Sequence, residues 1–482
     1  MKKFLAIILA GAMVLAMAGC SGGTSSESSS AAESSSQDSS VVEESSSAPE
    51  SSAVESTEPE STVSEQPEES SDAESSEAEP VAPAVMAEPM KSDLLTAALT
   101  SSLSLDETTA AKAAEDMLPL LMYTEGNPAR IAKVIKKLQA GEEVTVAFLG
   151  GSITQGTGAD NENCYAALTA KWIQAQYPDA KVNYVNAGIG ATGSYIGVHR
   201  CDTQVLSYNP DLVFIDFSVN DTSDRNTLNE ETYEGLIRKI WQYDTAPGII
   251  CIAMTQDNGT SVQSCHGEVT DKYSVPFVSY HDAMLNFLDT TDGVQWSDIS
   301  GDNIHPNKPG HAILSAMLTT YLQYVTDNLA GIDDADPELP APGTTGAKFE
   351  KAQLLTTDDA QPVSTGAFNK KEMTFGGFVN PWLCRTSDGT YPEDSALVLE
   401  VEAQNIGLLY GKLTKNAGVA DIYIDDALVT TLDADFTGGW GNYVEFAEIK
   451  TFLTTDKHTI KIVPRGNEGV ASAFYISGIT IS

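Results

Sequence analysis

Apolar runs and amphipathic segments alternate through the middle of the chain. Mainly apolar segments predict strands at residues 144–149, 182–186, 212–217, 249–254 and 277–279. Apolar positions at helical spacing predict helices at residues 129–140, 164–177, 195–206, 230–243, 261–273, 281–288 and 309–328. Strands that are apolar throughout are typical of a parallel sheet covered by helices on both faces. The pattern therefore predicts a doubly wound α/β domain over residues 125–328.

The pattern changes on both sides of this domain. Residues 91–124 carry apolar side chains at helical spacing and predict a helical lead-in. Residues 329–347 are rich in Asp, Pro and Gly and predict a linker. Further on, short and partly alternating segments predict strands at residues 397–401, 419–424, 459–463 and 474–481. Because Asp, Asn and Gly turns separate these strands, residues 348–482 are predicted to form an antiparallel, jelly-roll-like β-sandwich.

Charge is distributed unevenly along the 482 residues. The formal net charge of −41 argues against a nucleic-acid-binding function. Residues 21–90 contain no Lys or Arg and consist mainly of Ser, Glu, Ala and Pro. A segment of this composition cannot bury enough apolar surface to offset its ordering entropy. We therefore expect residues 21–90 to be a disordered acidic tether.

The first 20 residues have the features of an export signal. Lys2 and Lys3 precede an apolar stretch, residues 4–18, that is too short to be a convincing membrane span. The stretch ends in Met-Ala-Gly-Cys, which resembles the lipobox of bacterial lipoproteins and implies a lipid on Cys20. An ordinary secretory signal is the alternative. In both cases the protein is expected to be exported, and a lipid on Cys20 would anchor it to the membrane at the cell surface.

The remaining cysteines give no sign of a disulfide framework or a metal site. They are odd in number and lack metal-ligand spacing. Their positions are Cys164, Cys201, Cys251, Cys265 and Cys384. We therefore predict neither a set of disulfides nor a bound metal.

A serine follows the first predicted strand of the α/β domain. The strand ends in Gly150 and Gly151, which allow a sharp turn and keep bulk away from Ser152. Open α/β sheets bind ligands at the carboxyl ends of their strands. A glycine turn with Ser152 as a helix N-cap is the alternative interpretation.

Three later stretches end at positions where their polar groups can meet Ser152. A glycine-rich turn, residues 186–193, offers backbone N–H groups to an anion. Asn220 follows another apolar strand, although a helix cap is an equally ordinary role for it. Asp302 and His305 are three residues apart, which lets the carboxylate accept from one imidazole nitrogen and leaves the other free as a base. Each stretch alone also has a structural interpretation.

The four stretches GGSIT, NAGIGATG, SVND and DNIHP, in this order, resemble the SGNH (GDSL-like) hydrolase family of serine esterases. The resemblance spans the α/β domain and implies a flavodoxin-like strand arrangement. It implies that Ser152 is the nucleophile, that His305 is the general base and that Asp302 orients the imidazole. It implies no metal or organic cofactor.

The resemblance also implies an oxyanion hole. Its donors are the backbone N–H of Ser152, the side chain of Asn220 and a backbone N–H in the glycine-rich turn. Family spacing assigns the last donor to Ala191, where the family usually has glycine, and Gly190 is the neighbouring alternative. A second departure is Gly151, which stands where the GDSL form has Asp.

The motifs do not name the substrate, because the family cleaves carboxylic esters and thioesters of many sizes. Export, the tether and the sandwich, which resembles modules of carbohydrate esterases, favour removal of acetyl groups from an extracellular polysaccharide. Aromatic candidates for sugar stacking are Trp382, Trp440, Tyr391 and Tyr410, for which core or turn positions are the alternative. Other small acyl esters are possible substrates.

Two other functions are compatible with the sequence. One is a lipase or lysophospholipase that acts near the membrane. The other is a surface carbohydrate-binding protein in which the hydrolase-like domain is a non-catalytic scaffold. The complete set of Ser152, Asp302 and His305 argues against the scaffold, which has no need of all three.

Overall fold

The computed structural model describes residues 86–333, 335–343 and 347–482. The predicted signal peptide with Cys20 and residues 21–85 of the predicted tether lie outside the described residues. In the part of the chain that the structure describes, no helix is long and apolar enough to cross a membrane.

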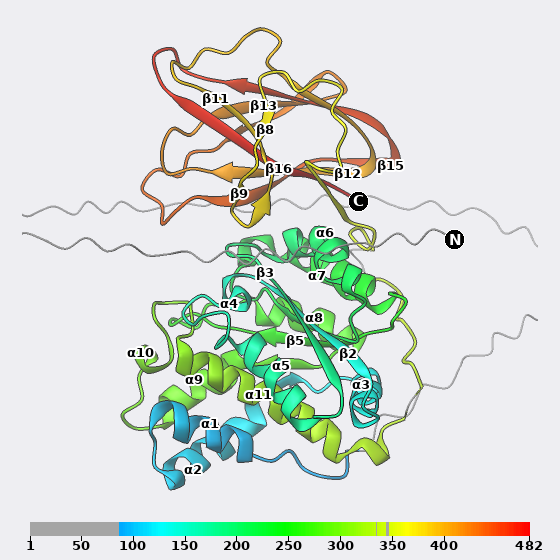
Figure 1. The fold of residues 1–482 in the computed structure, drawn as a ribbon, viewed down its shortest axis with the longest axis vertical. Helices are drawn as coiled ribbons and strands as arrows, with labels where there is room; N and C mark the ends of the chain where they lie inside the picture. Colours follow the sequence, from blue (N-terminus) through cyan, green and yellow to red (C-terminus); the bar gives the residue numbers. More distant parts are fainter. Residues whose placement is uncertain (1–85, 334, 344–346) are drawn as a thin grey trace, which may run out of the picture. The chain divides into compact units, whose positions relative to one another are not determined.

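A six-stranded sheet forms the centre of the α/β domain (Figure 1). Its strand order is β1-β6-β5-β4-β2-β3, with β1 antiparallel to β6 and all other pairs parallel. The strands are β1 (Met122–Thr124), β2 (Glu143–Gly150), β3 (Lys181–Gly188), β4 (Leu212–Asp216), β5 (Gly248–Ala253) and β6 (Phe277–Ser279). The chain passes from β2 to β3 on one side and then to β4 on the other, which places a ligand crevice at the carboxyl ends of these strands. The predicted doubly wound fold is confirmed.

Helices cover both faces of this sheet (Figure 1). One face is covered by α1 (Asp93–Leu103), α2 (Glu107–Met117), α3 (Ala129–Gln139), α5 (Tyr165–Gln176), α9 (Tyr280–Thr290) and α11 (Lys308–Asp327). The other face is covered by α6 (Ser194–Gln204), α7 (Asn226–Trp241) and α8 (Gln263–Tyr273). The apolar run of β2 follows from this arrangement, because Val146 and Phe148 enter the first core and Ala147 and Leu149 enter the second.

The predicted helical lead-in, residues 91–124, differs from the structure at its end. Helices α1 and α2 form there, and Asp106 accepts hydrogen bonds from the backbone N–H groups of Thr108 and Thr109 to cap α2. The last residues form strand β1 instead of helix, because they pair with β6 at the edge of the sheet. Apolar side chains of α1 and α2, such as Leu99 and Met117, are buried in the same core as the sheet.

Antiparallel strands make up the C-terminal region, as the sequence predicted (Figure 1). An eight-stranded sheet has the order β14-β13-β15-β12-β16-β11-β8, with β7 also paired to β16, and β9 and β10 form a separate pair. The strands are β7 (Gln353–Thr356), β8 (Asn369–Lys370), β9 (Thr374–Phe375), β10 (Phe378–Val379), β11 (Trp382–Thr386), β12 (Leu397–Lys412), β13 (Val419–Ile424), β14 (Ala427–Asp433), β15 (Tyr443–Arg465) and β16 (Ser472–Ile481). We refer to this region as the sandwich.

The sandwich and the α/β domain share a core. Phe349, Leu409 and Val444 of the C-terminal region belong to the same buried cluster as helices α6 and α7. On α6, the Tyr195 ring stacks on Phe446 with centroids 4.2 Å apart, and its hydroxyl lies 2.9 Å from Thr480 Oγ1. This shared core fixes the start of β15 beside the carboxyl ends of β2, β3 and β4.

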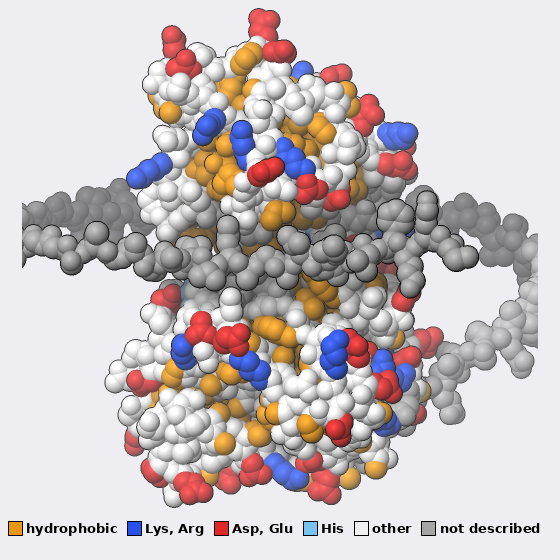
Figure 2. Space-filling view, in the orientation of Figure 1, with side chains coloured by type: hydrophobic (Ala, Val, Ile, Leu, Met, Phe, Trp, Pro, Cys, Tyr) orange, Lys and Arg blue, Asp and Glu red, His pale blue; other side chains and the backbone are white. Residues whose placement is uncertain are grey.

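Acidic and basic side chains are mixed over the face drawn in Figure 2. Among the described residues, Lys171 forms an exposed ion pair with Glu162, and Lys181 forms one with Glu143. Exposed pairs of this kind contribute little to stability. The stability of the two domains therefore rests mainly on their buried apolar clusters.

Candidate active site

The turn after β2 presents Ser152 at the carboxyl edge of the sheet. Ser152 begins the short helix α4 (Ser152–Gln155), directly after Gly150 and Gly151. A Cβ atom on Gly150 would lie 2.1 Å from Thr154 Oγ1, and one on Gly151 would lie 2.1 Å from Asn220 Oδ1. Both glycines are therefore required by their neighbours. In this chain the Asn220 side chain lies where a side chain at position 151 would stand.

A line of hydrogen bonds joins Ser152, His305 and Asp302. The Ser152 Oγ atom lies 2.9 Å from His305 Nε2, and His305 Nδ1 lies 2.7 Å from Asp302 Oδ2. The backbone N–H groups of Ile304 and His305 donate to Asp302 Oδ1 at 2.8 and 2.7 Å. The structure thus brings together the three residues that the sequence singled out, from segments 150 residues apart in the chain.

The Asp302–His305 loop is held rigidly at the amino end of α11. The short helix α10 (Trp296–Ile299) precedes it, and the Trp296 indole N–H donates to the carbonyl of Asp302 at 2.6 Å. Burial alone would raise the pKa of Asp302, but hydrogen bonds from the His305 ring and from the backbone lower it below its usual value. Asp302 is therefore ionised at neutral pH and can stabilise a positive charge on the imidazole.

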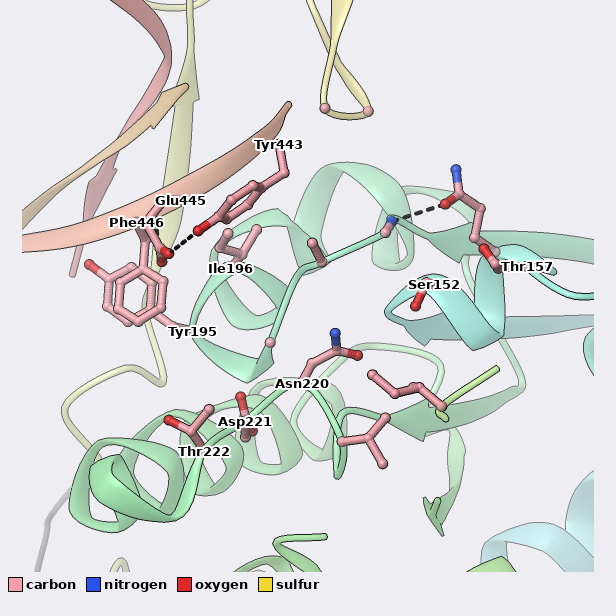
Figure 3. Close-up of a pocket in the computed structure, with 18 of the residues that line it drawn as sticks. Ser152, Thr157, Tyr195, Ile196, Asn220, Asp221, Thr222, Tyr443, Glu445 and Phe446 are labelled. Carbon is pink, nitrogen blue, oxygen red and sulfur yellow. Dashed lines mark hydrogen bonds between the residues drawn. The ribbon is translucent and has the colours of Figure 1, made fainter. Parts of the chain in front are cut away.

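Asn220 lies beside Ser152 in the turn that follows β4 (Figure 3). The backbone N–H of Asn220 donates to the carbonyl of Phe217 at 3.0 Å, and its side chain packs against Gly151. The next residue, Asp221, accepts hydrogen bonds from the backbone N–H of Ser194 and from the His266 ring, both at 2.9 Å. These bonds fasten the Asn220 turn to helices α6 and α8.

The glycine-rich turn after β3 reaches the same space. A Cβ atom built on Gly190 would lie 3.8 Å from Ser152 Cβ, so this residue borders the serine directly. The backbone N–H of Gly190 donates to Gln155 Oε1 at 3.0 Å. Ala191 has a φ of +59°, in the left-handed region that favours glycine. This conformation explains the glycine that the family usually has at this position.

Ser152 opens into a cavity of about 1030 Å³ that both domains line. Strand β15 contributes Tyr443, Glu445 and Phe446, and the turn before it contributes Trp440 (Figure 3). Tyr443 donates a hydrogen bond to Glu445 Oε2 at 3.0 Å. Polar side chains line much of the α/β side of the cavity, namely Gln155, Thr157, Asn220, Asp221, Thr222, Asp224, Arg225, Asn229, Asp302, Asn303 and His305.

Comparisons with known proteins place the chain in a family. Residues 148–313 match the model of the GDSL-like lipase/acylhydrolase family. The structure is also similar to a two-domain esterase active on acetylated mannans and co-crystallised with mannopentaose. That similarity has a TM-score of 0.65 and 31% sequence identity, and it covers 75% of this chain and 96% of the other. The chain belongs to the GDSL-like lipase/acylhydrolase family. It is an esterase.

A second crystal structure, of a two-domain esterase active on acetylated mannans, is equally similar to this esterase. Its TM-score is 0.66 at 32% identity, and it covers 75% of this chain and 97% of that chain. No curated protein shows significant similarity to the sequence. Because the crystal structures match over almost their whole length, the likeness includes both domains.

The sugar-stacking candidates of this esterase are placed very differently. Trp382 and Tyr410 are only 2% and 8% exposed and belong to the sandwich core, so for these two the core interpretation holds and sugar stacking does not. Tyr391 is half-buried, with its hydroxyl 2.9 Å from Ser472 Oγ. Trp440 is 72% exposed and lines the cavity that contains Ser152. Strand alternation accounts for the first two, since inward positions of a sandwich take the large apolar side chains.

Several residues at the site of the esterase were not predicted from the sequence. Tyr443, Glu445 and Phe446 reach it only because the sandwich packs on α6 and α7. Gln155 lies on the nucleophile turn itself, and its proximity to Ser152 along the helix was the available signal. Within the described residues, no group of three or more His, Cys, Asp or Glu side chains is arranged to hold a metal ion.

Proposed function

We propose that this esterase removes acetyl groups from an extracellular polysaccharide, with Ser152 as the nucleophile. The observation that carries the proposal is the hydrogen-bonded line from Ser152 through His305 to Asp302 at the base of the cavity. A serine alone is a weak nucleophile, and an adjacent base oriented by a carboxylate is what activates it.

In the first half of the reaction, Ser152 Oγ attacks the ester carbonyl carbon while its proton passes to His305 Nε2. Asp302 accepts the hydrogen bond from Nδ1 and stabilises the imidazolium that forms. Collapse of the tetrahedral intermediate breaks the ester bond, and His305 returns the proton to the departing sugar hydroxyl. In the second half, His305 takes a proton from water, and the water oxygen attacks the acetyl-serine carbonyl carbon. Collapse of this second intermediate breaks the bond to Ser152 Oγ, to which His305 returns the proton, and releases acetic acid, which ionises to acetate.

The negative oxygen of each tetrahedral intermediate needs hydrogen-bond donors. The N–H of Ser152 lies in the first turn of α4, where helical N–H groups have no partner within the helix. The Asn220 side chain and an N–H of Gly190 or Ala191 border the same space. We assign these groups to the oxyanion hole.

The lining of the cavity favours a carbohydrate over a long acyl chain. A fatty acyl group needs a continuous apolar channel, whereas in this lining amide, carboxylate and hydroxyl side chains are interspersed with apolar ones such as Ile196, Val219 and Leu228. Hydroxyl-rich sugars can satisfy such groups with hydrogen bonds. Since the related two-domain esterase is active on acetylated mannans, we propose an acetylated mannan as the first substrate to test.

We also propose that the esterase works outside the cell. The support is the export signal in the sequence and the lipobox-like stretch before Cys20. A lipid on this cysteine, followed by the acidic segment, would hold the catalytic domain away from the membrane surface and give it access to polymers. Metabolic labelling with a fatty acid analogue tests this proposal, since Cys20→Ala should abolish the label.

Acetate release from a panel of acetylated glycans tests the substrate proposal. We expect the purified esterase to release acetate from at least one acetylated polysaccharide and to prefer an acetyl over an octanoyl nitrophenyl ester. A preference for the octanoyl ester would instead support a lipase. An enzyme that hydrolyses nitrophenyl acetate but no acetylated glycan would contradict the polysaccharide proposal.

Replacing Trp440 should weaken binding of the polymer selectively. The exposed indole offers a flat apolar face at the rim of the cavity, and Tyr443 stacks on it with ring centroids 5.1 Å apart. We expect Trp440→Ala to raise KM for the acetylated polysaccharide by about five- to tenfold, the loss of roughly 1 kcal/mol of stacking. The KM for nitrophenyl acetate should hardly change, because this small ester does not reach the rim.

Leu453→Ala is the matched control for Trp440→Ala. Leu453 is 98% exposed on β15 and does not line the cavity. Kinetics on both substrates should therefore match those of the wild type. An equal rise in KM for polymer and small ester in Trp440→Ala would contradict a role in polymer binding.

Gln155→Ala tests whether Gly190 is an oxyanion donor. In the structure the Gly190 N–H donates its hydrogen bond to the side-chain oxygen of Gln155. A substrate oxygen must therefore displace Gln155 before it can accept from Gly190. Removing this competitor should raise kcat/KM on nitrophenyl acetate by about two- to tenfold, in line with the net strength of one hydrogen bond. A fall in kcat/KM would show that the Gln155 amide assists the substrate and that Gly190 is not the donor.

A further inference from the structure

A buried arginine lies directly beneath the Ser152 turn. Arg200, on α6, is 0% exposed. Its Nη2 donates to the carbonyl of Gly150 at 2.8 Å, and its Nη1 donates to the carbonyl of Ala187 at 2.5 Å. Gly150 is the last residue of β2, just before the Ser152 turn, and Ala187 is near the end of β3, just before Gly190. One guanidinium therefore joins the two strands that carry the nucleophile and the oxyanion donors.

The same guanidinium also reaches the turn that follows β3. Its Nη2 lies 3.4 Å from Thr192 Oγ1, and the Thr192 hydroxyl donates to the carbonyl of Ile189 at 2.7 Å. The backbone N–H of Ile189 donates in turn to the carbonyl of Gly150 at 3.1 Å. Arg200 and these bonds hold the segment that contains Gly190 and Ala191 at a fixed distance from Ser152.

Arg200 is a buried charge without a counter-ion among the described residues. Its partners are two backbone carbonyls, the Thr192 hydroxyl and the Gln204 side chain. The Gln204 Oε1 atom accepts from Nη1 at 2.7 Å. Asp216, which pairs with Gly150 in the sheet, directs its carboxyl to Thr154 at 3.3 Å on the other face. Burial lowers the pKa of Arg200 to about 9, so the group remains a cation at neutral pH.

Burying such a charge is costly, so fold stability does not explain it. An unpaired ion in the interior loses its hydration, and neutral hydrogen-bond partners repay only part of that loss. Arg238 on α7 is also buried but does have a counter-ion, because Glu350 Oε2 lies 2.8 Å from its Nε. Arg200 instead holds the ends of β2 and β3, directly before Ser152 and Gly190, which gives the charge a use at the site.

We propose that Arg200 is a positioning residue for the esterase reaction. It sets the spacing between Ser152 and the N–H groups of Gly190 and Ala191, and its uncompensated charge favours the oxyanion of the tetrahedral intermediate. The inference rests on the proposed role of Ser152. Preorganised donors and charges of this kind act on the transition state more than on the bound substrate, so their removal lowers kcat rather than raising KM.

Two substitutions separate the charge from the geometry. Arg200→Met keeps an apolar chain of similar length but removes the charge and all the hydrogen-bond donors. Arg200→Lys keeps the charge but loses the two-pronged guanidinium that donates to both strands. We expect kcat on nitrophenyl acetate to fall by about 10²–10³-fold in Arg200→Met, with KM nearly unchanged. Arg200→Lys should recover part of this loss. Unchanged kcat in either variant, or a loss confined to KM, would overturn the proposal.

The affinity for phenylboronic acid is a second measurement. It should not change if Arg200 only stabilises the fold. The boron of this acid accepts a lone pair from Ser152 Oγ as the hydroxyl proton passes to His305, which leaves a negatively charged tetrahedral adduct. Folded Arg200→Met should lose boronate affinity by at least the factor by which kcat falls, while Arg200→Lys retains more of it. If Arg200→Met does not fold, Arg200→Lys decides, with at least a tenfold fall in kcat expected.

Two controls keep the outcomes distinct. Arg238→Met also removes a buried arginine, but one that lies outside the cavity lining, so it should lower the unfolding temperature without lowering kcat. Ser152→Ala tests the proposed function itself. If Ser152→Ala is inactive and both Arg200 variants keep wild-type kcat and boronate affinity, only the inference about Arg200 fails. If Ser152→Ala is active, the proposed function fails as well.

Discussion

Ser152→Ala is expected to lower kcat on nitrophenyl acetate by about 10⁴–10⁶-fold, the range found when a nucleophile of this type is removed. Without the Oγ atom, no acyl-enzyme can form, and His305 has lost the hydroxyl from which it takes a proton. Substrate contacts elsewhere in the cavity remain, so KM should change little. Steady-state kinetics on the ester, with active-site titration of the wild type, measure both quantities.

The serine variant should fold normally, because Ser152 Oγ hydrogen-bonds only to the His305 ring in the described residues. Its unfolding temperature should therefore stay close to that of the wild type. Ser207→Ala is a matched control, since among the described residues this exposed hydroxyl bonds only to the Thr203 carbonyl. Wild-type turnover by Ser152→Ala would show that another group is the nucleophile.

Asp302→Asn is expected to lower kcat by about 10²–10⁴-fold through the tautomer of His305. The Asp302 Oδ1 atom accepts two backbone N–H bonds, so the carbonyl oxygen of an asparagine would keep that position. Its amide nitrogen would then face His305 Nδ1, which must become an acceptor. The imidazole proton is forced onto Nε2, and this nitrogen can no longer take the proton of Ser152.

The pH dependence of Asp302→Asn gives a further check. Because the hydrogen bonds keep the pKa of Asp302 below its usual value, the wild-type carboxylate stays ionised at neutral pH and well into the acidic range. The loss in Asp302→Asn should therefore persist over the whole active pH range instead of vanishing at one end. Asp298→Asn is the control, since its side chain caps α10 without touching His305. Near wild-type kcat in Asp302→Asn would contradict the assigned role of the carboxylate.

The α/β fold was predictable because its strands are buried on both faces. In β2 every residue from Val146 to Leu149 is apolar and buried, and this signal is strong even in a short segment. The strand order and the ends of β2, β3 and β4 then follow from general rules for open sheets. For this reason the sequence located Ser152, Asn220 and His305 near one another before any contact was known.

The sandwich was predictable only in outline. The second half of β12 is buried on both faces, because Leu408 enters the sandwich core while Leu409 packs on the α/β domain. Alternation therefore ends there, and the sequence predicted only the first part of the strand. The middle of β15 is exposed and polar because neither of its faces is fully covered there. Only residues 459–463 of this strand therefore carried a strand signal.

Contacts between distant segments explain what the sequence could not supply at the site. The placement of Trp440 and Tyr443 depends on how the sandwich docks on α6, which no local pattern encodes. The bond from Gly190 to Gln155 and the buried fork of Arg200 likewise join residues whose types alone suggest surface positions. Sequence reasoning located the reacting groups but not the residues that hold and surround them.

Acetate release from acetylated mannan by the wild type and by Ser152→Ala, measured side by side, tests the central claim most directly. That claim is that Ser152, in the cavity between the two domains, deacetylates a polysaccharide. The account predicts steady acetate release by the wild type and a rate for Ser152→Ala that cannot be told from the enzyme-free reaction. Equal release by the two proteins, or none by a wild type that still hydrolyses nitrophenyl acetate, would contradict it.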